Sequence, residues 1–166
     1  MPRTRIISDE TVFATLRRML EEGGDKAVSF GSVAKATGLA PPTLVQRYGN
    51  REGMVRAARL AAWDALEKRT AHAIAETAGK GPQGFLKAIG PVDFAALASD
   101  LRDAELAQRA ATWRQGVETA LTLRLGGGQK ARESAALLFA AWQGQMLWSS
   151  AGEQTVRLKD AVKRLT

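Results

Sequence analysis

Apolar residues recur three and four positions apart in each long segment of this chain, and glycines or prolines separate the segments. Val12, Leu16 and Leu20 show this spacing in the first segment, which ends at Gly23-Gly24. Side chains spaced in this way fall on one face of an α-helix, whereas a half-buried strand alternates apolar and polar residues. The sequence contains no clear strand pattern, internal repeat or low-complexity tract. It therefore predicts an all-α fold.

Capping residues and helix breakers mark where the individual helices begin and end. Ser8, Ser29 and Asn50 each precede a helical pattern, and their side chains can accept a hydrogen bond from the first turn. The segment DFAALASDLRD is ambiguous and reads as a helix with a break near Ser99. The helices before the last are expected to stop at or just before Gly23, Gly38, Gly49, Gly79, Pro91, Gly126 and Gly152. A last short helix would carry Leu158, Ala161, Val162 and Leu165.

The fourth expected helix is long enough to leave one group of helices and support another. We therefore expect a three-helix domain over residues 1–50, which continues into the start of the long helix. Residues 51–166 would form the second domain, made of the connecting helix and a helical bundle.

The charge of the chain favours an acidic partner. The formal net charge is +7, and residues 1–60 hold ten Lys and Arg against six Asp and Glu. Residues 61–166 hold fourteen against eleven, so positive charge is denser in the N-terminal part. This distribution makes the N-terminal part the better candidate for binding nucleic acid.

Residues 29–48 contain two short helical patterns separated by a glycine turn. Gly38 can adopt the positive φ that a sharp turn often needs, and Leu44 can anchor the second helix against the first. Pro41 and Pro42 suit a first helical turn, where a missing N–H removes no intrahelical hydrogen bond. This arrangement is the plan of a helix-turn-helix, whose second helix lies in the major groove of DNA.

The second helix of this pair carries the side chains that would touch DNA. Its two prolines form an apolar tip that can contact a thymine methyl group. Thr43, Gln46 and Arg47 offer hydrogen bonds to bases or phosphates.

The segment SFGSVAKATGLAPPTLVQRYGNREGMV resembles the DNA-binding segment of the TetR family of bacterial transcriptional regulators. The similarity covers about residues 8–60, and the rest of the chain matches in its helical layout. The resemblance implies a three-helix DNA-binding head that a long fourth helix joins to a ligand-binding and dimerisation bundle. It also implies a homodimer, most often a repressor, that binds a palindromic operator in double-stranded DNA and responds to a small-molecule effector.

Individual residues of the segment fall on positions with known roles in that family. Ser29 falls on the cap that touches backbone phosphate, and Arg51 falls on the basic residue that grips phosphate at the start of the fourth helix. Val45 replaces a Tyr that contacts phosphate, and Ala40 replaces a Ser or Thr cap at a cost of about 1 kcal/mol. The DNA-binding candidates are Ser29, Pro41, Pro42, Thr43, Gln46, Arg47 and Arg51.

The apolar face of the penultimate helix has two interpretations. The usual one is the core of the monomer. The other is a dimer interface, in which this helix and the last one meet their symmetry mates in a four-helix bundle. The dimer-interface candidates are Leu138, Trp142, Gln145, Met146, Leu158 and Val162.

An effector pocket is expected between the connecting helix and the middle of the bundle. Its candidate lining residues are His72, Phe85, Phe94 and Trp113, each of which has a place in the core or at the surface as its alternative.

Other classes of function find little support in the sequence. With one histidine and no cysteine there is no zinc site and no motif for nucleophilic catalysis, so neither an enzyme, a metal nor a cofactor is expected. No apolar run follows the charged N-terminus, and the longest apolar stretch, residues 135–142, is too short to span a bilayer. We therefore expect a cytoplasmic protein with no membrane partner. The alternative function is a helical small-molecule-binding or interaction protein whose DNA-binding head has lost its activity.

Overall fold

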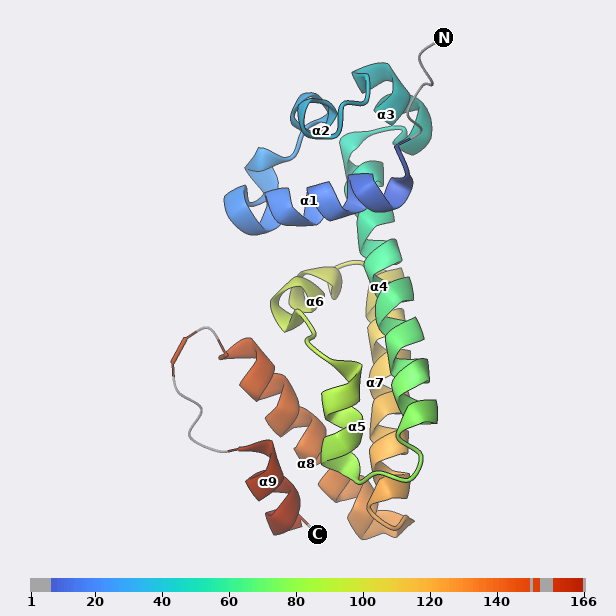
Figure 1. Ribbon diagram of the computed structural model, residues 1–166, viewed down its shortest axis with the longest axis vertical. Helices are drawn as coiled ribbons and strands as arrows, with labels where there is room; N and C mark the ends of the chain where they lie inside the picture. The colour runs from blue at the N-terminus through green and yellow to red at the C-terminus, as the bar shows by residue number, and fades with distance from the viewer. Residues whose placement is uncertain (1–6, 150, 153–156, 166) are drawn as a thin grey trace. The chain divides into compact units, whose positions relative to one another are not determined.

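The computed structural model describes residues 7–149, 151–152 and 157–165, and all regular structure in these ranges is helical (Figure 1). The predicted all-α class is therefore confirmed. The helices are α1 (Asp9–Gly23), the 3-10 helix η1 (Asp25–Ala27), α2 (Phe30–Thr37), α3 (Pro41–Tyr48), α4 (Arg51–Glu76), α5 (Pro82–Ile89), α6 (Phe94–Asp100), α7 (Ala104–Arg124), α8 (Gly128–Leu147) and α9 (Leu158–Leu165).

The chain divides into two compact units, Met1–Asp64 and Ala65–Thr166. We call them the N-terminal unit and the C-terminal unit. The division falls inside α4, so residues 51–64 of this helix belong with α1, α2 and α3. The boundary expected from the sequence was at residue 50, just before α4 starts, whereas the two units divide between Asp64 and Ala65.

Local capping explains where the helices of the N-terminal unit begin. The Ser8 hydroxyl accepts a hydrogen bond from the Thr11 amide, and Ser29 forms a reciprocal capping box with Ser32. Asn50 Oδ1 accepts a hydrogen bond of 2.7 Å from the Gly53 amide at the start of α4. Each of these caps satisfies an amide that has no partner within its helix.

The turn between α2 and α3 depends on a glycine and lacks a side-chain cap. Gly38 has φ of 78°, a left-handed conformation that costs glycine little. Ala40 precedes α3 and makes no capping hydrogen bond with its side chain, while Pro41 and Pro42 occupy the first turn. The helix therefore begins where the prolines permit, without the help of a polar cap.

The core of the N-terminal unit consists of the apolar residues that the helical spacing places on inward faces. Val12 and Leu16 of α1, Val33 of α2, Leu44 of α3 and Met54 of α4 are all fully buried. Burying one such side chain is worth about 1.5–3 kcal/mol, so this cluster fixes the orientation of α3 against α1 and α2.

An aromatic cluster forms the centre of the C-terminal unit. It consists of Phe94 from α6, Trp113 from α7, and Phe139 and Trp142 from α8, with ring centroids 5.4–6.5 Å apart. Phe94 meets Phe139 and Trp142 edge to face, which is a favourable geometry for aromatic rings. All four side chains are buried, so the cluster joins three helices of the unit.

Polar contacts fix α7 against residues 65–76 of α4. The guanidinium of Arg109 makes two hydrogen bonds, of 2.6 and 2.7 Å, to the carboxylate of Glu67. The indole N–H of Trp113 donates to the hydroxyl of Thr70 at 2.9 Å, which satisfies a buried donor.

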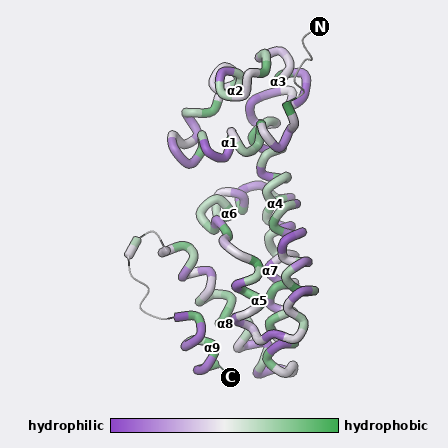
Figure 2. The backbone as a smooth tube through the Cα atoms, viewed as in Figure 1, coloured by the Kyte–Doolittle hydropathy of each residue, from purple (hydrophilic) through white to green (hydrophobic). Residues whose placement is uncertain are grey.

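Figure 2 shows hydrophobic and hydrophilic residues interspersed along the helices. Among the residues that the structure describes, no helix combines the length and the apolar character needed to cross a membrane.

Candidate nucleic-acid interface

Helix α3 buries one face and exposes the other. Leu44 is fully buried, whereas Pro41, Pro42, Val45 and Gln46 are exposed, with Val45 at 45%. The exposed residues lie one and four positions apart, so they share a side of the helix that we call the outer face of α3. The outer face holds three of the predicted DNA-binding residues, together with Val45.

Thr43 and Arg47 do not join the outer face. Thr43 is half-buried. The Arg47 guanidinium turns back to the start of α1, where Nη1 donates to the Ile7 carbonyl at 2.9 Å and lies 3.3 Å from Asp9 Oδ1. In this structure Arg47 is therefore tied to its own chain, contrary to the expectation that it projects beside Gln46.

Arg51 is also tied to its own chain. Nε donates to the Val28 carbonyl at 2.8 Å, and Nη2 donates to the Asp25 carbonyl at 2.6 Å and lies 2.7 Å from the Asp25 carboxylate. The hydrogen bond to Asp25 raises the pKa of Arg51. The guanidinium thus joins α4 to the segment before α2, and a phosphate contact would require these bonds to exchange.

The exposed polar groups of α2 complete the candidate interface. Ser29 is exposed at the N-terminal end of α2, although its hydroxyl is bonded within the capping box. Lys35 is exposed in the last turn of α2 and was not among the predicted residues. Lys35 is the only basic residue between Lys26 and Arg47, so it is the one residue of the α2–α3 segment before Arg47 whose charge could have marked it as a phosphate contact.

The hydroxyl of Tyr48 donates a hydrogen bond to Asp9 Oδ1, and the phenol ring packs on Phe13 with centroids 5.9 Å apart. Burial raises the pKa of Tyr48 from 10 to about 12, with further contributions from the hydrogen bond and the negative charge of Asp9. The C-terminal end of α3 is thus held to α1 by a contact that depends on a protonated phenol.

This contact predicts the ionisation of Tyr48, which can be followed alone because the chain has one tyrosine. We expect a midpoint near pH 12 in the ultraviolet absorbance of tyrosinate. The contribution to the free energy of unfolding should be complete below pH 10 and lost as the pH rises toward 12, since the unfolded state loses its proton first. Asp9→Asn should lower the midpoint, and Tyr48→Phe should remove this part of the alkaline loss. A midpoint near 10 in the folded protein would contradict the contact.

The structure corrects two of the dimer-interface candidates. Leu138 and Trp142 are buried in the C-terminal unit itself, so they belong to the core of the chain and offer no surface to a partner. The other four candidates, Gln145, Met146, Leu158 and Val162, are half-buried. Three large apolar side chains in or directly after α8 are exposed, and they are those of Leu137, Leu147 and Trp148.

The effector-pocket candidates are packed or exposed rather than gathered around a hollow. Phe94 and Trp113 belong to the aromatic cluster, and Phe85 is fully buried. His72 is exposed and lies 3.1 Å from the carboxylate of Glu76, one turn along α4. These positions agree with the alternative that the sequence left open, in which each residue belongs to the core or the surface.

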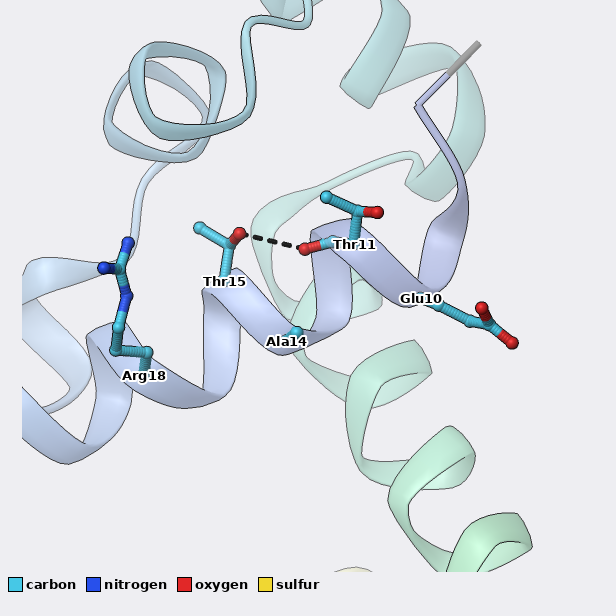
Figure 3. A pocket seen from close by; sticks show the side chains of 5 residues that line it. All are labelled: Glu10, Thr11, Ala14, Thr15 and Arg18. Carbon is cyan, nitrogen blue, oxygen red and sulfur yellow. Dashed lines mark hydrogen bonds between the residues drawn. The ribbon is translucent and has the colours of Figure 1, made fainter.

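Two shallow hollows lie elsewhere on the surface. One follows a single face of α1, where the hydroxyl of Thr15 donates to the Thr11 carbonyl within the helix (Figure 3). The other lies at the C-terminal end of α4 beside Arg124, whose guanidinium donates to the Ile74 and Thr77 carbonyls and lies over the Phe85 ring. None of the four effector-pocket candidates lines either hollow.

No protein-family model, curated protein or solved structure matches this chain. Within the described ranges, no group of three or more histidine, aspartate or glutamate side chains is placed to hold a metal ion. The resemblance to the TetR family therefore stays a prediction that depends on the motif in residues 29–55.

Proposed function

We propose that this chain is a sequence-specific DNA-binding regulator of transcription, of the TetR type. In this proposal α2 and α3 form a helix-turn-helix, and α3 enters the major groove of double-stranded DNA. The observation that carries the proposal is the division of α3 into a buried side at Leu44 and an exposed outer face.

The geometry of α3 suits insertion into a groove. The major groove of B-DNA is about 12 Å wide and admits an α-helix with its side chains. Gly38 allows the sharp turn that leads into α3, and Leu44 holds the helix to the core from behind. The side chains of Val45 and Gln46 are then free to approach base edges.

Phosphate contacts would come from the ends of α2. Ser29 lies at its positive N-terminal end, and Lys35 is an exposed cation near its C-terminal end. Arg47 and Arg51 could add to them only by exchanging their present partners for phosphate oxygens, which are acceptors of the same kind.

A dimer would give two copies of α3 and therefore two half-sites, about 34 Å apart, in a palindromic operator. Exposed residues of α8 support self-association, because Leu137 and Trp148 lie on the same side of the helix as the small residues Ala141 and Gly144. Small residues permit close approach of a second helix, and apolar patches at the surface often mark interfaces.

A small-molecule effector would act by shifting the population of two arrangements of the dimer, as expected for a ligand-responsive repressor. It must bind the two arrangements unequally to have this effect. The aromatic cluster is packed ring against ring, so a ligand entering there would have to separate rings such as those of Phe94 and Trp142.

A second candidate function is that of a helical small-molecule-binding or interaction protein whose N-terminal unit no longer binds DNA. The observation that favours it is the engagement of both Arg47 and Arg51 with Asp9 and Asp25 of the same chain. The two functions differ in their response to salt, since only DNA binding is expected to release counterions.

Selection of bound duplexes from a random pool, followed by a salt titration, tests the proposal. We expect an enriched palindrome and an affinity that falls steeply with salt concentration. Gln46→Ala should weaken binding to the enriched sequence by about 1–3 kcal/mol and relax the preference at one position. Lys35→Ala should weaken binding to all sequences and lower the slope of the salt dependence by about 1.

Matched control variants lie on exposed faces of the C-terminal unit. Gln108→Ala on α7 and Lys68→Ala on α4 make the same chemical changes far along the chain from α3. Both should leave affinity and salt dependence unchanged. Failure to enrich any duplex, together with binding that is insensitive to salt, would favour the second candidate function.

A further inference from the structure

We infer that the outer face of α3 recognises A·T base pairs, with thymine methyl groups against Pro42 and Val45 and an adenine opposite Gln46. This inference rests on the proposed function and adds to it the base composition of each half-site. The occupant to which it commits is duplex DNA, in keeping with the excess of positive charge in residues 1–60.

The chemistry of the outer face excludes most other base contacts. Its members are two prolines, a valine and one amide, and all are exposed. Guanine is usually bound by Arg or Lys, and cytosine by a carboxylate, but the outer face holds neither type. The nearest cation in the chain, Arg47, is turned toward Ile7 and Asp9. The outer face is left with apolar contacts and with the amide of Gln46.

The apolar side chains and the Gln46 amide of the outer face match the two bases of an A·T pair. The thymine methyl group is the apolar feature of the major groove, and it is recognised by contact with apolar side chains. Adenine presents an acceptor at N7 and a donor at N6, which a glutamine amide can pair with at the same time. Val45 and Gln46 are adjacent, so neighbouring bases can meet the two kinds of contact.

The start of α3 reinforces this apolar character. Pro41 and Pro42 have no backbone N–H, and the Thr43 amide already donates to the Ala40 carbonyl at 3.0 Å. Helix N-termini bind phosphate through free amides, and those of the first three residues of α3 are missing or bonded. This end of the helix is therefore suited to methyl groups on the groove floor rather than to phosphate.

Replacing thymine by deoxyuridine tests the inference, because it removes the methyl group and leaves base pairing intact. The duplex enriched by selection would be compared with copies in which each thymine of the half-site is replaced in turn. We expect about three- to fourfold weaker binding for each methyl group in contact. We call the affinity for the thymine duplex divided by the affinity for the deoxyuridine duplex the ratio of affinities. In Val45→Ala this ratio should approach unity at a single thymine position.

Two controls separate this effect from others. Thymines flanking the half-sites should be replaceable without loss, and Lys35→Ala should bind less tightly while keeping the same ratio of affinities. Val45 is exposed, and circular dichroism should show that Val45→Ala keeps the fold of the parent protein.

The outcomes distinguish this inference from the proposed function. Equal affinity for the thymine and deoxyuridine duplexes, or enriched half-sites with G·C pairs where α3 docks, would overturn the inference and leave DNA binding standing. Enrichment of no duplex at all would overturn the proposed function and the inference with it. We expect replacement of individual thymines by deoxyuridine to lower the affinity, and we expect Val45→Ala to reduce the ratio of affinities.

Discussion

Leu44→Ala is expected to lower the free energy of unfolding of the N-terminal unit by about 2–5 kcal/mol. Leu44 is fully buried among Val12, Leu16 and Val33, and it is the one buried residue of α3. Truncation removes its apolar contacts and leaves a cavity that the surrounding helices fill only in part. Urea denaturation followed by circular dichroism measures the change.

Val45→Ala provides a matched control at the next residue. Val45 is 45% exposed, so its truncation should change the free energy of unfolding by no more than about 0.5 kcal/mol. Equal losses for the two variants, or a larger loss for Val45→Ala, would mean that α3 is rotated about its axis. Such a rotation would bury the outer face and remove the basis of the proposed function.

Trp142→Ala is expected to lower the free energy of unfolding of the C-terminal unit by about 3–5 kcal/mol. Only 1% of Trp142 is exposed, and its ring centroid lies 5.4 Å from that of Phe94 and 5.9 Å from that of Phe139. The substitution removes one of the two indole rings that pack between α6, α7 and α8, together with several favourable aromatic contacts. Thermal and urea denaturation should both report the loss.

Trp148→Ala makes the same change near the end of the same helix, where the side chain is 68% exposed. At low protein concentration we expect a change in the free energy of unfolding within about 0.5 kcal/mol. If the chain dimerises through α8, Trp148→Ala should weaken self-association in sedimentation experiments. A loss of stability equal to that of Trp142→Ala would show that Trp148 belongs to the core.

The positions of the helices could be predicted because their signals are local. Ser8, Ser29 and Asn50 act as caps through hydrogen bonds to residues three positions away, and Gly38 ends α2 through its own φ. The inward direction of Leu44 also followed from helical spacing. All of these features depend on residues within about one turn of each other.

The partners of the two arginines could not be predicted in the same way. Arg47 bonds to residues 38 and 40 positions earlier in the chain, and Arg51 bonds to residues 23 and 26 positions earlier. Arg47 was expected to offer hydrogen bonds to bases or phosphates, and Arg51 was expected to bind phosphate because the resemblance places it on a basic residue with that role. Only the packing of α1 and η1 against α3 and α4 brings carbonyl and carboxylate oxygens within their reach.

The apolar face of α8 posed a different problem. Periodicity identified a broad face but could not say which part of it faces the chain's own core, because both sides of that face are equally apolar. The structure places Leu138 and Trp142 inside and leaves Leu137 and Trp148 outside. The choice is made by where α6 and α7 lie, because Trp142 packs against Phe94 and Trp113, which are 48 and 29 positions earlier in the chain.

The sequence by itself therefore determined the all-α class, the capped starts and glycine stops of the helices, and the inward anchor of α3, since each follows from the conformational preferences of neighbouring residues. The tertiary structure alone decided which arginines bind oxygens of their own chain and which aromatic rings form the core. It also decided that the guanidinium of Arg47 turns away from the outer face of α3. These features depend on distances between segments that folding brings together, and no local pattern specifies those distances.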